Sequence, residues 1–155
     1  MLFSCSPKGY WINGSCKPKS ENYKILETPF KESSLIDNEF IYISEINYFA
    51  DSSNQLDSIP YISAIGFKKN GKAFLNGYKY KSRYSENLEK NSFETGQEIG
   101  YYRIENDNII FERFSCSDFG NYIRLEGKVK GDSIIFLEKN RKKIYTKSDL
   151  PNSIN

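Results

Sequence analysis

The sequence predicts an all-β protein in which an antiparallel up-and-down meander closes into a barrel of about eight strands. A short pattern occurs twice, at residues 104–111 and 129–136, and each copy has a β-branched strand end, an Asn-Asp or Gly-Asp turn, and an Ile-Ile-Phe strand. Asn and Gly tolerate the positive φ of tight turns, so each copy predicts a β-hairpin. Aromatic residues form 15% of the chain, which suits strands better than a helix bundle. A sheet of this size tends to close because closure removes its exposed edges.

The first half of the chain contains three predicted strands, at residues 39–49, 61–69 and 72–80. The first is long, and its even positions form an apolar face made of Phe40, Tyr42, Ile46 and Tyr48. The polar stretch at residues 50–60 is typical of a loop. The second and third strands are joined at Asn70-Gly71, which is the strongest short signal for a hairpin.

The second half contains five more predicted strands, at residues 99–105, 108–114, 120–129, 133–138 and 142–147. Before them, residues 82–96 break the strand pattern and could form either two helical turns after Ser85 or a loop. In the strand at 120–129, two sets of side chains alternate between the faces. One face carries Ile123, Leu125, Gly127 and Val129, and the other carries Tyr122, Arg124, Glu126 and Lys128. Such alternation is typical of a sheet with one buried face and one solvated face.

The chain is predicted to contain one domain, the barrel of residues 36–147. A chain of 155 residues buries a sufficient core without a disulfide framework or a metal. The preceding residues, 1–35, are rich in Gly, Pro, Ser and Lys, which predicts an irregular tether or plug. The residues at the other end, 148–155, form a polar tail.

Composition and motifs argue against catalysis, metals, cofactors and nucleic acid. The chain has no histidine, which removes the commonest general base and zinc ligand. It has 22 basic and 20 acidic residues, so its net charge of +2 requires no nucleic-acid partner. Glu112, Glu126 and Glu138 could supply a glycosidase pair, but each lies beside Lys or Arg, as in surface charge ladders. We therefore expect no catalytic residues, no metal site and no cofactor.

The cysteines indicate a cellular compartment. The tetrapeptide that ends at Cys5, Leu-Phe-Ser-Cys, resembles the lipobox of bacterial lipoproteins, in which the cysteine becomes lipid-modified. A lipid on Cys5 would leave Cys16 and Cys116 as an even pair that could form one disulfide. Alternatives are a cytoplasmic protein with Met1 as its true start, a bridge between Cys5 and Cys16, or three buried free thiols.

The chain resembles the lipocalin-like (calycin) bacterial lipoproteins. The resemblance rests on the lipobox-like segment, on the double hairpin of residues 100–136, and on Gly9-Tyr10-Trp11, which fits the G-x-W signature near the start of lipocalins. It implies a barrel anchored to the outer membrane that faces the periplasm or the cell surface.

The function predicted from these features is non-enzymatic binding of a small amphipathic or hydrophobic molecule inside the barrel. Aromatic walls supply contact area at low entropic cost, and an inward cation would orient a polar head. Arg113 is in step with Ile109 and Phe111, so it is predicted to point inward. The predicted ligand-binding residues are Trp11, Tyr42, Tyr78, Tyr102, Phe111 and Arg113. The alternative is a protein-interaction module, such as an inhibitor or immunity-type protein, with a packed barrel and no ligand.

Overall fold

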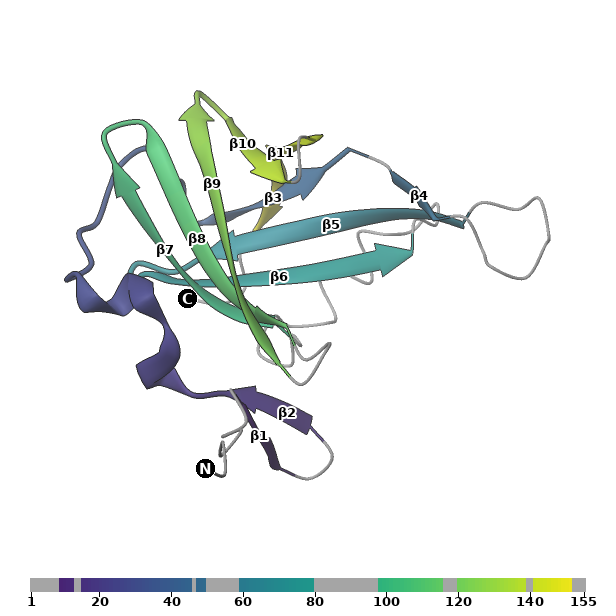
Figure 1. The fold of residues 1–155 in the computed structure, drawn as a ribbon. Coiled ribbons are helices and arrows are strands. Elements are labelled where there is room, and N and C mark those ends of the chain that lie inside the picture. The colour runs from purple at the N-terminus through teal and green to yellow at the C-terminus, as the bar shows by residue number, and fades with distance from the viewer. Residues whose placement is uncertain are drawn as a thin grey trace, which may run out of the picture.

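The structure is a computed structural model, and it describes residues 9–12, 15–45, 47–49, 59–79, 98–115, 120–138 and 141–151. Within these ranges the chain forms an eight-stranded antiparallel meander that closes into a barrel (Figure 1), as the sequence predicts. The first strand is in two pieces, β3 (Phe40–Ser44) and β4 (Asn47–Phe49). The others are β5 (Ile59–Phe67), β6 (Lys72–Lys79), β7 (Glu98–Glu105), β8 (Asn108–Ser115), β9 (Asn121–Lys130), β10 (Ser133–Glu138) and β11 (Arg141–Pro151).

Three tight turns connect the strands where the sequence predicts them. Gly71, between β5 and β6, has φ +83°, and Gly131, between β9 and β10, has φ +55°. Asn106, between β7 and β8, has φ 58°. These are left-handed conformations that Gly and Asn adopt at the lowest cost, so the turn residues fix the register of the three hairpins.

The largest differences from the predicted strand boundaries are in the first and last strands, and β5 also begins at Ile59, inside the stretch 50–60 that the sequence predicts to be a loop. The strand expected at 39–49 is interrupted after Ser44, because β3 pairs with both β11 and β5, whereas β4 pairs with β5 alone. The last strand continues to Pro151, past the expected end at 147, because its pairing with β3 resumes after a shift in register. The alternative helix or loop at 82–96 lies outside the described residues.

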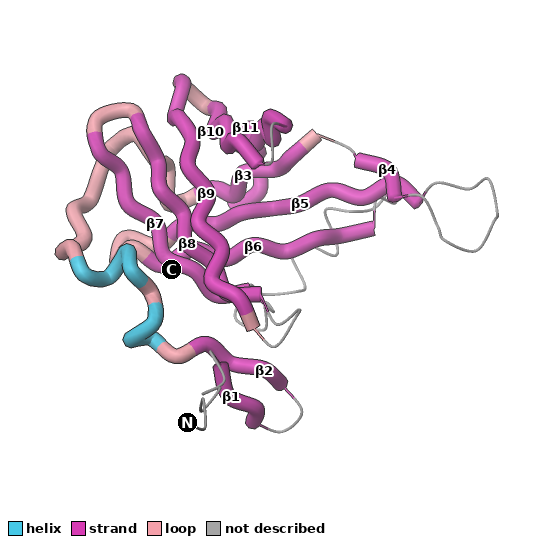
Figure 2. The backbone as a smooth tube through the Cα atoms, in the orientation of Figure 1, coloured by secondary structure: helices cyan, strands magenta, loops and turns pink. Residues whose placement is uncertain are grey.

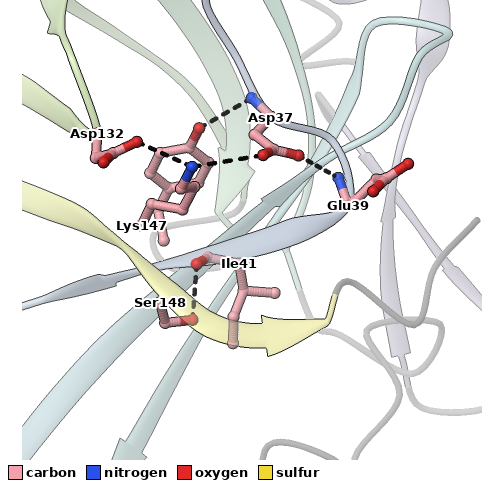
Figure 3. Close-up of polar contacts among 7 residues, drawn as sticks. Asp37, Glu39, Ile41, Asp132, Lys147 and Ser148 are labelled. Carbon is pink, nitrogen blue, oxygen red and sulfur yellow. Dashed lines mark hydrogen bonds and ion pairs between the residues drawn. The ribbon is translucent and has the colours of Figure 1, made fainter.

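The barrel closes at the seam between β3 and β11, where side chains add to the backbone pairing (Figure 3). Ser148 Oγ donates a hydrogen bond of 2.9 Å to the Ile41 carbonyl. The Lys147 ammonium lies 2.9 Å from an Asp132 carboxylate oxygen and 3.5 Å from one of Asp37. The hydrogen bond that Lys147 donates to Asp132 is the main cause that raises the pKa of Lys147 above its ordinary value. Lys147 therefore links the β9–β10 turn and the segment before β3 to the seam.

Two 3-10 helices and a short hairpin precede the barrel, in a part of the chain for which the sequence indicated no regular elements. The hairpin, β1 (Gly9–Ile12) and β2 (Ser15–Pro18), forms a separate two-stranded sheet. The 3-10 helices η1 (Ser20–Asn22) and η2 (Lys24–Glu27) connect it to the barrel (Figures 1 and 2). Tyr122 holds this connection, because its hydroxyl accepts from the Lys19 N–H and donates to the Lys19 carbonyl, at 2.8 Å in both cases.

Candidate functional site

One end of the barrel interior is packed with side chains. This turn end contains the tight β5–β6, β7–β8 and β9–β10 turns. Three of the predicted ligand contacts, Tyr42, Tyr102 and Phe111, retain only 1%, 3% and 0% of their accessible surface. A side chain that lined a water-sized space would keep some surface, so these three pack against neighbours. They belong to one apolar cluster, whose largest other members are Phe67, Phe136 and Tyr145. Their contact with a ligand stays a prediction.

The segment before β3, residues 28–39, closes the turn end. Ile36 is buried in the core cluster, and the Phe30 ring packs against it. The ring centroids of Phe30 and Tyr102 lie 5.4 Å apart in an edge-on arrangement. Phe30 also covers Gly71, where an added Cβ would lie 2.6 Å from the ring. The closing segment thus approaches the β5–β6 turn at a position that has no side chain.

Tyr102 joins the closing segment to the barrel through its hydroxyl group. The hydroxyl lies 3.2 Å from the Asn38 Oδ1 and 3.0 Å from the Lys68 carbonyl, both of which can accept its hydrogen. Burial is the main cause that raises the pKa of Tyr102 well above its ordinary value, and the charge of Glu32 adds to the effect. The Tyr42 hydroxyl likewise accepts a 3.0 Å hydrogen bond from the Asp37 N–H.

The opposite end of the interior, here called the loop end, carries polar and half-buried side chains. Arg113 alternates with the buried Phe111 on β8, and Lys143 alternates with the buried Tyr145 on β11, so both cations occupy inward positions. Leu75 and Ile123 pack against the core cluster and are also only partly buried. These four inward side chains are therefore less enclosed than the aromatic cluster at the turn end.

Lys143 is held over the interior by two contacts. Its ammonium donates a 3.0 Å hydrogen bond to Ser63 Oγ and lies 5.3 Å from the centre of the Tyr145 ring. Ser44 Oγ accepts a 2.9 Å hydrogen bond from the Ser63 N–H, which connects β3 to β5 at the same level. The loop end therefore combines two cations and two hydroxyls with the apolar side chains of Leu75 and Ile123.

The sequence identified only part of this arrangement. Alternation on β8 places Arg113 in step with Ile109 and Phe111, both of which are buried in the structure. The same alternation would have placed Lys143 inward, in step with Tyr145. The sequence gives no indication that Ser44 and Ser63 belong to this region, because only the pairing of β3 with β5 brings the two serines together.

Several predicted site residues fall outside this region or outside the described residues. Trp11 lies on β1, paired with Cys16 of β2 in the separate hairpin, so the G-x-W segment is not part of the barrel sheet. Tyr78 lies on β6, paired with Ile62. The structure does not describe the side chains of Trp11, Cys16 and Tyr78, and Cys5 and Cys116 lie entirely outside the described residues.

The outer face of β7 and β8 is covered by Tyr23, which lies between η1 and η2, and by η2. Tyr23 and Ile25 are buried against Ile110 and Phe114. Glu112 is buried on the same face, with 4% of its surface exposed, and its carboxylate accepts a 2.7 Å hydrogen bond from the Ile25 N–H. Glu112 thus satisfies a backbone donor of η2. Glu126, in contrast, is exposed and paired with Arg124, so these two glutamates occupy different surroundings.

Comparisons with known proteins assign no family to this chain. A scan against protein-family models and searches of curated proteins and solved structures found no match to this chain. The closed eight-stranded antiparallel barrel is compatible with the lipocalin-like fold. Among the described residues, no group of three His, Cys, Asp or Glu could hold a metal, and no helix is long and apolar enough to cross a membrane.

Proposed function

We propose that this protein is a non-enzymatic binding protein that holds a small amphipathic molecule at the loop end of its barrel. The observation that supports the proposal is the inward, half-buried position of Arg113 and Lys143 beside Leu75 and Ile123. Ligand sites in proteins combine apolar walls with a few polar groups that set orientation. Two cations favour a ligand whose polar head is an anion, such as a carboxylate or a sulfonate.

The packed cluster at the turn end would form the floor of this site. The apolar part of the ligand would lie on the exposed surface of Leu75 and Ile123, and its head group would approach Arg113 and Lys143. Tyr102 and Phe111 would then support the site from below, since little of their surface is exposed.

Fluorescence titration with 1-anilinonaphthalene-8-sulfonate, an amphipathic anion, tests this function. We expect the wild-type protein to bind the dye and Arg113→Gln to weaken binding about tenfold, because an ionic hydrogen bond contributes about 1.5–3 kcal/mol. Lys69→Gln is the charge-matched control, because Lys69 is exposed in the β5–β6 turn, at the opposite end of the barrel, and should leave dye affinity unchanged. Thermal unfolding of both variants checks that they fold. Equal dye affinity in the Arg113 variant and the wild type would contradict the proposal.

The second candidate is a protein-interaction module with a packed barrel, of the inhibitor or immunity type. The burial of Tyr42, Tyr102 and Phe111 favours it, because packed aromatics leave no room for a ligand at the turn end. If the wild-type protein binds neither this dye nor a fatty acid, the packed module is the better description.

For localisation we propose a lipid anchor on Cys5 at the bacterial outer membrane, facing the periplasm or the cell surface. The lipobox-like sequence ending at Cys5 supports the anchor. Cys16 and Cys116 would then form the disulfide. Intact-mass analysis of protein purified from its native membrane fraction, with and without reductant, tests both points. A bridge between Cys5 and Cys16 would rule out the anchor.

A further inference from the structure

The outer face of β9, β10 and β11 carries a groove that is separate from the barrel interior. The groove has a volume of about 650 Å³. Its apolar floor includes Ile135 and Leu137, which point outward because they alternate with the buried Ile134 and Phe136. Leu137 is 62% exposed. The exposed Leu137 has no such cover among the described residues, whereas Tyr23 and η2 cover the apolar side chains on the outer face of β7 and β8.

Basic side chains surround this floor. Arg124, Lys128, Lys130 and Lys142 line the groove, together with a single carboxylate, that of Glu126. Glu126 lies 3.0 Å from Arg124, and Lys128 lies 3.3 Å from Asp107. Both pairs are exposed, so they neutralise the groove only weakly. Among the residues that the structure describes, none forms an ion pair with Lys130 or Lys142.

We propose that this groove is a docking site for an acidic segment of a partner protein. An apolar side chain of the segment would cover Leu137, while its carboxylates would pair with Lys130 and Lys142. Charge complementarity supports this occupant, because four cations and one carboxylate border the apolar floor. A second copy of this chain, meeting the groove with its own groove, would bring the same cations into repulsion.

The shape of the surface also favours a protein segment. A groove accommodates a narrow, extended chain better than it does the flat surface of a bilayer. β9, β10 and β11 each pair with a strand on both sides, so the partner would dock at the groove through side chains and not by adding a strand to an edge. This inference concerns the outer face and does not depend on the proposed ligand site inside the barrel.

Fluorescence anisotropy with a short synthetic peptide, in which Asp and Glu flank one Leu, tests the docking site. A peptide with Asn and Gln in place of the acids is the neutral control. We expect binding of the acidic peptide only, with lower affinity as salt concentration rises. Leu137→Ser and Lys142→Glu should each weaken binding about tenfold, as expected for an apolar anchor and a charge partner. Lys72→Glu, which makes the same charge change at an exposed position on β6, should leave affinity nearly unchanged.

Three results would overturn the proposal. The first is equal binding of the acidic peptide by the Leu137→Ser variant and the wild type. The second is that the protein binds anionic phosphatidylglycerol vesicles but not the peptide, and that Lys142→Glu abolishes the vesicle binding. This result would identify a membrane surface as the occupant of the groove. The third is concentration-dependent dimerisation that Leu137→Ser abolishes, which would identify a second copy as the occupant. Arg113→Gln should leave peptide affinity unchanged, because Arg113 does not line the groove, and this variant keeps the interior site and the groove distinguishable.

Discussion

Replacing Tyr102 by alanine distinguishes a packed turn end from a hollow one. The Tyr102 side chain is 3% exposed, and its ring centroid lies 4.8 Å from that of Phe67 and 5.4 Å from that of Phe30. Truncating an aromatic ring in such a site removes its packing and leaves a void, so we expect the free energy of unfolding to fall by about 3–5 kcal/mol. For a protein of this size, that loss lowers Tm by roughly 10 °C.

Tyr102→Phe separates the contribution of the ring from that of the hydroxyl. This variant keeps the ring contacts but removes the donor that faces Asn38 and the Lys68 carbonyl. Both acceptors lose this hydrogen bond, so we expect a loss of about 1 kcal/mol. Urea unfolding followed by circular dichroism measures both variants, with an unchanged m-value as the check on two-state behaviour. If Tyr102→Ala lowers stability by less than about 1 kcal/mol, the ring faces open space and the packed turn end is refuted.

Two further predictions concern the outer face and pH. Glu112→Ala should lower the free energy of unfolding by about 1–3 kcal/mol, because it leaves the Ile25 N–H buried without its acceptor. Glu126→Ala, which removes an exposed ion pair, should lower it by less than about 0.5 kcal/mol. Similar urea midpoints for the two variants would contradict this prediction. Burial is the main cause that raises the pKa of three tyrosines above the ordinary value of 10.0, namely Tyr42, Tyr102 and Tyr122. The contribution of these tyrosines to the free energy of unfolding is therefore complete below pH 10. It is lost as the pH rises from 10 toward the folded-state pKa, because in this range the tyrosines ionise freely only in the unfolded chain. We expect the urea midpoint to fall above pH 10 while phenolate absorbance at 295 nm stays incomplete in the folded protein; complete titration near pH 10 without unfolding would argue against buried tyrosines.

The hairpins are the part of this fold that the sequence determines most directly. The turns at Gly71, Asn106 and Gly131 depend on residues that adopt positive φ, and this property is local. The alternation on β9 likewise predicts the buried Leu125 and Val129 and the exposed Arg124 and Lys128, because strand geometry sends successive side chains to opposite faces. Local chemistry was also sufficient to place Arg113 on the inner face of β8.

The tertiary structure alone decides which parts of each face are packed. Ile110, Glu112 and Phe114 point outward, yet they are buried because Tyr23 and η2, distant in sequence, lie over them. The interruption between β3 and β4 has the same kind of cause, since only β3 contacts both β5 and β11.

The division of the interior into a packed turn end and an accessible loop end is equally non-local. Alternation shows that Tyr102 and Arg113 both face inward, but it cannot show that one is enclosed while the other remains half-buried. That difference depends on the closing segment, whose Phe30 and Ile36 fill the turn end, and on the strand pairing that brings Lys143 to Ser63. The sequence therefore determines the direction of each side chain, and the space around it is set by the closure of the barrel and by the segments that pack against it.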